Sequence, residues 1–135
     1  MFPGNQVRLR YGYVVKCLGY DKASDTVRCE YLPDTRSGTP GAEKVKVKGN
    51  IHWVSLRHGH TSPVHLYDRL FADAEGAEKL NPDSKRTITA QLEPALKEAK
   101  PGAPIQFERH GYFVADTSGT AFNRTVTLRD SWAKA

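Results

Sequence analysis

The chain has 135 residues, of which 39% are hydrophobic and 26% charged, and its formal net charge is +5. This length suits one modest hydrophobic core or two small ones. No apolar run is long enough to span a membrane, and Met1–Gly4 has neither the basic start nor the apolar core of a secretory signal peptide. The composition therefore argues against a membrane or secreted protein, and we expect a cytoplasmic one.

The positive charge is confined to the first half of the chain. Residues 1–72 contain 11 lysines and arginines against 6 acidic residues, whereas residues 73–135 contain 9 of each. This asymmetry favours a polyanionic partner for the first half. A solvated basic surface is the alternative that charge alone leaves open.

Residues 6–16 alternate between apolar and polar positions, which predicts one β-strand. On such a strand Arg8 and Arg10 would point from the same face, about 7 Å apart. Two guanidinium groups at this spacing can bind successive phosphates, or a base edge and its phosphate. They can equally pair with carboxylates of a neighbouring strand.

Turn-forming residues over 18–25 predict a hairpin loop, Thr26–Leu32 reads as the return strand, and residues 33–41 form a long polar loop.

A second hairpin is predicted over residues 44–55. Alternation of valine with Lys44, Lys46 and Lys48 indicates a strand with three lysines on one face, Gly49-Asn50 is a turn signal, and residues 51–55 alternate again.

The rest of the chain predicts further strands around one short helix. The expected elements are a strand at 64–71, a polar surface excursion at 72–81, a strand at 87–92, a helix at 93–99, and strands at 105–116 and 122–130.

The strand at 105–116 carries candidate base-reading side chains. Gln106 and Glu108 would share one face and Arg109 the other, unless a bulge at Gly111 re-aims them. Glutamine and arginine suit base edges because of their paired donor and acceptor groups and planar fork. Polar decoration of an edge strand is the alternative.

The cysteines and histidines do not form a metal-binding pattern. Cys17 and Cys29 lie in separate β-like stretches, so we expect reduced thiols. His58, His60 and His65 cluster without a cysteine or carboxylate at a close companion spacing, so we expect no metal site.

Six motifs follow one another along the chain: Val7–Arg10, Lys48–Ser55, Leu66–Phe71, Leu80–Ser84, Gln106–Phe113 and Phe122–Asp130. In this order they resemble the C-terminal anticodon-binding region of bacterial glutaminyl-tRNA synthetases. The resemblance covers nearly the whole chain.

The resemblance implies an all-β fold of two six-stranded barrels related to ribosomal protein L25. Residues 1–72 would form most of the distal anticodon-binding barrel, and residues 73–135 the returning part of the proximal one. In this family the anticodon bases are unstacked into separate pockets, so the partner would be the anticodon loop of tRNA(Gln).

The resemblance also assigns contacts where the motifs match. Arg8 and Arg10 correspond to arginines that approach the first anticodon position and its phosphate. Gln106 and Arg109 correspond to residues near the middle base, with Glu108 as an orienting partner. Lys44, Lys46 and Lys48 are candidate phosphate contacts.

The parent enzymes of the family are class I ligases that attach glutamine to tRNA using ATP with magnesium. No HIGH-like or KMSKS-like signature occurs in these 135 residues, so we expect the chain to be inactive alone, to need no cofactor and to work beside a catalytic domain. We expect Met1 to be a fragment start and the proximal barrel to be open, with an edge that favours self-association.

Two other classes of protein remain as alternatives. One is a ribosomal RNA-binding barrel of the L25 type, which would not need a second region like 106–130. The other is a small β-barrel enzyme, for which the sequence offers no convincing catalytic arrangement.

Overall fold

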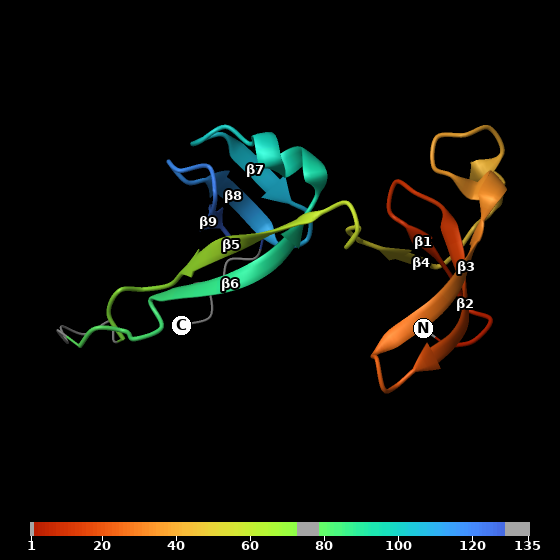
Figure 1. Ribbon diagram of the computed structural model, residues 1–135, viewed down its shortest axis with the longest axis horizontal. Helices are drawn as coiled ribbons and strands as arrows, with labels where there is room; N and C mark the ends of the chain where they lie inside the picture. Colours follow the sequence, from red (N-terminus) through yellow and green to blue (C-terminus); the bar gives the residue numbers. More distant parts are fainter. Residues whose placement is uncertain (1, 73–78, 129–135) are drawn as a thin grey trace. The chain divides into compact units, whose positions relative to one another are not determined.

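The computed structural model describes residues 2–72 and 79–128, which form two compact units, Met1–Trp53 and Val54–Ala135. Unit 1 contains a four-stranded sheet in the order β3-β2-β1-β4 (Figure 1). Its elements are β1 (Gln6–Leu9), β2 (Val14–Asp21), β3 (Thr26–Leu32), the 3₁₀ turns η1 (Pro33–Thr35) and η2 (Ala42–Lys44), and β4 (Gly49–Ile51).

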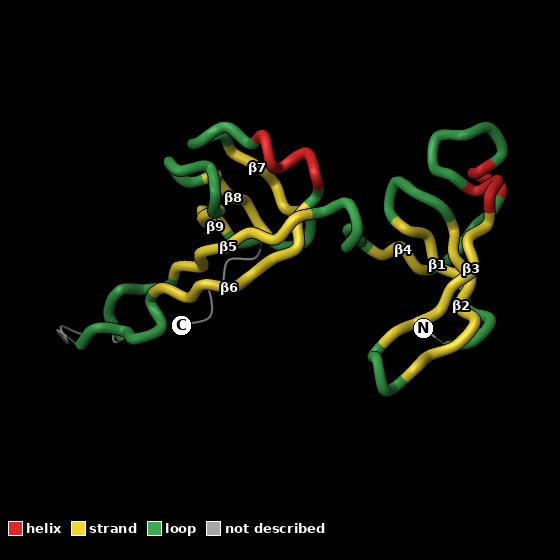
Figure 2. Tube along the Cα trace, in the orientation of Figure 1, coloured by secondary structure: helices red, strands yellow, loops and turns green. Residues whose placement is uncertain are grey.

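Unit 2 contains a five-stranded sheet in the order β6-β5-β9-β8-β7. Figure 2 shows that it consists mainly of strands and loops. Its elements are β5 (His60–Tyr67), β6 (Lys85–Leu92), the 3₁₀ helix η3 (Pro94–Glu98), β7 (Pro104–Phe107), β8 (Gly111–Ala115) and β9 (Phe122–Val126).

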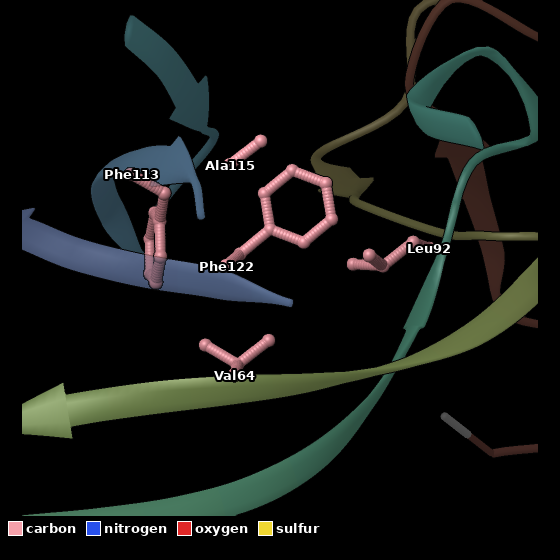
Figure 3. Packing of buried hydrophobic residues seen from close by; sticks show 5 residues of the cluster. All are labelled: Val64, Leu92, Phe113, Ala115 and Phe122. Atoms are coloured by element: carbon pink, nitrogen blue, oxygen red, sulfur yellow. The ribbon is translucent and has the colours of Figure 1, made fainter. Parts of the chain in front are cut away.

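The expected all-β class is confirmed. Each unit has its own small core, as the length of the chain suggested. In unit 2 five buried side chains come from four strands and lie against one another (Figure 3): Val64, Leu92, Phe113, Ala115 and Phe122. In unit 1 the buried hydrophobic side chains are Val7, Val14, Val15, Cys17 and Ala42. Closure of either sheet into a six-stranded barrel stays a prediction.

The single strand expected over residues 6–16 is wrong, because the chain reverses in its middle. Tyr11 takes the left-handed conformation at φ 60°. The Gly12 amide donates to the Leu9 carbonyl at 2.8 Å, which closes a tight turn between β1 and β2. Side chains before and after this turn therefore do not share one continuous face.

The hairpin expected over residues 44–55 is also wrong. Gly49-Asn50 does not turn but begins β4, which runs parallel to β1 with Val7 opposite Gly49. A Cβ atom on Gly49 would lie 2.8 Å from Cγ1 of Val7. The glycine therefore permits close packing of two strands, a use that a turn signal in the sequence does not distinguish.

The region 105–116 forms two strands rather than one. A turn at residues 108–110 separates β7 from β8, with Arg109 at φ 66°. Gly111 does provide the expected close approach, since a Cβ atom there would lie 2.5 Å from the Val126 carbonyl oxygen.

Other expected elements agree with the structure. The strand at Thr26–Leu32, the strand at 87–92 and the short helix at 93–99 are present, the helix being 3₁₀. The excursion at 72–81 lies largely outside the described residues, as does the end of the strand at 122–130.

The chain divides into its two compact units between Trp53 and Val54, because β5 pairs with β6 and β9 of the second unit. The expected domain boundary between residues 72 and 73 stays a prediction. Assignment of the two parts to a distal and a proximal barrel stays a prediction.

Candidate nucleic-acid interface

Arg8 lies in β1, and its guanidinium group holds the loop between β3 and β4. Nη1 donates to the Thr35 carbonyl at 2.6 Å and to Oγ of Ser37 at 3.4 Å. Nη2 donates to the carbonyls of Ala42 and Val45, both at 3.2 Å. One planar guanidinium group thus hydrogen-bonds to several residues of a loop that has little regular secondary structure. Arg8 therefore has a structural role here.

The loop held by Arg8 borders an open pocket of about 860 Å³. Its lining includes Arg8 itself, Ser37–Pro40, Lys46 and Asn50. The rest of the lining includes the acidic Glu43 and the apolar Ala42, Val45 and Val47, so the pocket is mixed in character. Sequence reasoning missed it, because it depends on the parallel pairing of β4 with β1.

Arg10 lies in the turn after β1, and it has different neighbours from Arg8. Its Nη2 donates to the Tyr11 hydroxyl at 3.3 Å, and its Cζ lies 5.2 Å from the centroid of the Tyr11 ring. The indole Nε1 of Trp53 donates to the Arg10 carbonyl at 3.1 Å. One arginine and two aromatic residues are thus gathered at a single turn.

Lys44, Lys46 and Lys48 are all exposed, but they do not form the expected strand face. Lys44 ends η2, and the other two lie in the irregular segment before β4. Lys48 borders a second, smaller pocket of about 390 Å³. Contact of these lysines with phosphates stays a prediction.

In unit 2 the candidate residues lie at the β7–β8 hairpin. Gln106 is exposed on β7 opposite Tyr112, and Glu108 and Arg109 lie in the turn. The turn is closed by the His110 amide, which donates to the Phe107 carbonyl at 2.8 Å. Arg109 is exposed, and its backbone lies in the left-handed region. Its side chain therefore does not follow the alternation of strand faces that the sequence predicted.

The hairpin has a rigid base. The Phe107 ring stacks on Phe113 at 4.4 Å between centroids and contacts Phe122 at 5.4 Å. Phe113 and Phe122 belong to the buried cluster of unit 2. The side chains of the turn are therefore carried on the core rather than on a long loop, which limits the ordering entropy that binding would cost.

No group of three or more histidine, cysteine and acidic side chains among residues 2–72 and 79–128 could hold a metal ion. His65 instead shares a hydrogen bond of 2.9 Å with the Thr87 hydroxyl across β5 and β6. Within the same described ranges, no helix is both long and apolar enough to cross a membrane.

The five main candidates are distributed over the two units. Arg8 and Arg10 belong to unit 1, and Gln106, Glu108 and Arg109 to unit 2. The exposed aromatic residues beside Arg10 were not predicted as site residues. The sequence did contain a hint of this turn, because Gly12 follows Tyr11 inside the apparent strand, and a glycine there is compatible with a break in the strand.

Residues 50–116 match the family model described as tRNA synthetases class I (E and Q), anti-codon binding domain. A protein named glutamine–tRNA ligase from Cupriavidus taiwanensis is 57% identical over 150 aligned residues, covering 99% of this chain and 26% of the relative. The protein of the same name from Bordetella pertussis is 56% identical over 151 aligned residues, covering 100% of this chain and 26% of the relative. The chain therefore spans about a quarter of the length of the curated relatives that it matches.

Proposed function

Since the chain belongs to the anticodon-binding domain family of the class I tRNA synthetases (E and Q), we propose that it binds the glutamine anticodon loop as part of a glutamine–tRNA ligase. The observation that carries this proposal is identity of 55–57% to several glutamine–tRNA ligases over 99% or more of the chain. A ribosomal RNA-binding barrel is not favoured, because these relatives are named as ligases.

Recognition in this proposal is divided between the two units. Gln106 and Arg109 read the middle anticodon base, and Glu108 orients them. Support comes from their position at a hairpin turn that is anchored on the unit 2 core. Glutamine and arginine can each make paired hydrogen bonds to a splayed base, which a duplex would not expose.

Unit 1 contributes contacts at the first anticodon position. Arg10 is placed beside two aromatic rings, which suits a base and its phosphate. Arg8, whose two Nη groups are bonded to the adjoining loop, acts at the same position by ordering that loop. Lys44, Lys46 and Lys48 contribute salt-dependent attraction to phosphates without base preference.

The ligase reaction belongs to the proposal only at the level of the whole enzyme. That enzyme would attach glutamine to tRNA(Gln) with ATP and magnesium in the cytoplasm, beside a catalytic domain of the same chain.

Self-association through a sheet edge is part of the same proposal. In the five-stranded sheet of unit 2, β6 is an edge strand, and five of its eight residues are exposed. Such a strand offers backbone groups to a second chain. Light scattering should detect a dimer that dissociates on dilution, and a strictly monomeric, folded chain would contradict it.

The decisive experiment is a fluorescence titration with two RNA stem-loops, one carrying a glutamine anticodon and one with its middle base changed. Arg109→Ala should reduce the preference for the cognate loop by about tenfold, the worth of one good arginine–base pair. Arg86→Ala is the matched control, because it removes the same charge from the exposed face of β6.

The control variant should lower the affinity for both stem-loops equally and leave the ratio of the two affinities unchanged. If the native chain binds both stem-loops with equal affinity, and added salt abolishes binding of both, base reading by this chain is refuted. A basic surface would then account for all of its binding.

A further inference from the structure

Tyr11 is an exposed aromatic residue in a backbone conformation that is unfavourable for it. Its side chain is 75% exposed, and its φ is 60°. A bulky residue in the left-handed region costs about 1 kcal/mol relative to glycine or asparagine. Because the ring buries little surface in return, the stability of the fold does not explain a tyrosine at this position.

The turn that carries Tyr11 is held in place on both sides. The Arg10 amide donates to the Ile51 carbonyl at 2.9 Å, and the Trp53 indole donates to the Arg10 carbonyl at 3.1 Å. A Cβ atom on Gly12 would lie 3.7 Å from Cζ2 of Trp53, so the indole also runs along the turn. The tyrosine is therefore presented from a fixed backbone.

The surroundings of the ring favour an anionic partner with a flat face. The guanidinium group of Arg10 lies beside it, with its Cζ 5.2 Å from the ring centroid. Residues 1–53 contain nine lysines and arginines against five acidic residues, a net charge of +4. A cationic ligand would be repelled, whereas a nucleotide offers a π-face to the ring and a phosphate to the arginine.

We propose that Tyr11 is a stacking platform for one unstacked nucleobase of the bound anticodon loop, with Arg10 on the adjoining phosphate and Trp53, itself 46% exposed, fixing the turn. This inference rests on the proposed function, and it adds a contact that depends on ring stacking rather than on base edges. Stacking tolerates every base, so Tyr11 contributes affinity and positioning, while the polar side chains discriminate.

The test is a titration of the full chain with the glutamine anticodon stem-loop and with loops that carry one abasic nucleotide at each position in turn. Tyr11→Leu removes the ring but keeps a side chain of similar size and the same backbone cost. Tyr11→Phe is the matched control, because it keeps the ring and loses only the hydroxyl that accepts from Arg10. Thermal unfolding of both variants verifies that the fold persists.

Tyr11→Leu should weaken binding of the intact loop by about 5- to 150-fold, the range that one stacked base contributes, and Tyr11→Phe by far less. At one abasic position the native chain should lose the same factor, and Tyr11→Leu should add nothing further. That pattern would identify the stacked nucleotide.

The inference alone is overturned if the native chain prefers the cognate loop but Tyr11→Leu binds it equally well. It is also overturned if the losses from Tyr11→Leu and from the abasic nucleotide multiply at every position. Binding that depends on Tyr11 without any preference between loops would support stacking and contradict the proposed function. No binding of either loop by the native chain would contradict both.

Discussion

Replacing Arg8 by lysine keeps the positive charge but removes the planar fork that spans the loop between β3 and β4. The arginine donates to four acceptors, three of which are backbone carbonyls at 2.6 to 3.2 Å. A lysine ammonium places its donors on one nitrogen, so it cannot serve both the Thr35 side and the Ala42 side of the loop.

The size of the effect follows from the bonds that are lost. A hydrogen bond from a charged donor contributes about 1.5–3 kcal/mol, and at least two carbonyls would lose theirs. Arg8 is only partly buried, so water replaces part of this. We expect Arg8→Lys to lower the free energy of unfolding of unit 1 by about 2–4 kcal/mol.

Urea unfolding of the full chain, followed by hydrogen exchange of the amides in residues 35–45, measures this change. Arg36→Lys is the control, since Arg36 is exposed in the same loop and its side chain makes no hydrogen bond to the described residues. Loss of exchange protection should be confined to the loop and to Val14, whose amide donates to Oγ1 of Thr35 at 2.8 Å. Equal stability of the two variants would refute the assigned role of Arg8.

Three further predictions concern local features of the two sheets. Arg109→Gly should raise the free energy of unfolding by about 1 kcal/mol, by relieving a left-handed arginine, while reducing affinity for the cognate loop; an unchanged urea midpoint would contradict it. The hydrogen bond from Ser118 lowers the pKa of Asp116, so its contribution to stability is present at neutral pH and lost as pH falls through the lowered pKa. The difference in urea midpoint between the native chain and Asp116→Asn should therefore shrink below about pH 4, and a pH-independent difference would exclude this linkage. Cys17 on β2 lies opposite Cys29 on β3. The backbone amide and carbonyl of Cys17 bond to Asn5 and Gly4 rather than to Cys29, so the two cysteines form a non-hydrogen-bonded pair, in which side chains lie closest together. Diamide should therefore oxidise the pair to an intramolecular disulfide. Burial, followed by the smaller effect of the neighbouring Cys17, raises the pKa of the Cys29 thiol, so oxidation should be faster at pH 9 than at pH 7. A mass spectrum that lacks the loss of two hydrogens would refute the pairing.

The all-β class, the net charge of the first half and several elements follow from the sequence alone. Period-two alternation with β-branched residues predicted Thr26–Leu32 and the strand at 87–92, because both are long enough for the pattern to be read locally. The family motifs also predict which residues contact an anticodon, and this stays a prediction. These properties depend on composition and short-range order, so no knowledge of partner strands is needed.

Where a strand breaks and what it pairs with were decided by tertiary structure. The turn at Tyr11 interrupts an alternation that looks continuous, and Gly49 begins a strand rather than a turn because it packs closely on Val7. Arg8 was expected beside Arg10, but carbonyls 27 to 37 residues away take its donors. Alternation reports that a segment suits a pleated surface, but the parallel pairing of β4 with β1 arises from contacts distant in sequence, and those contacts set the direction of each side chain.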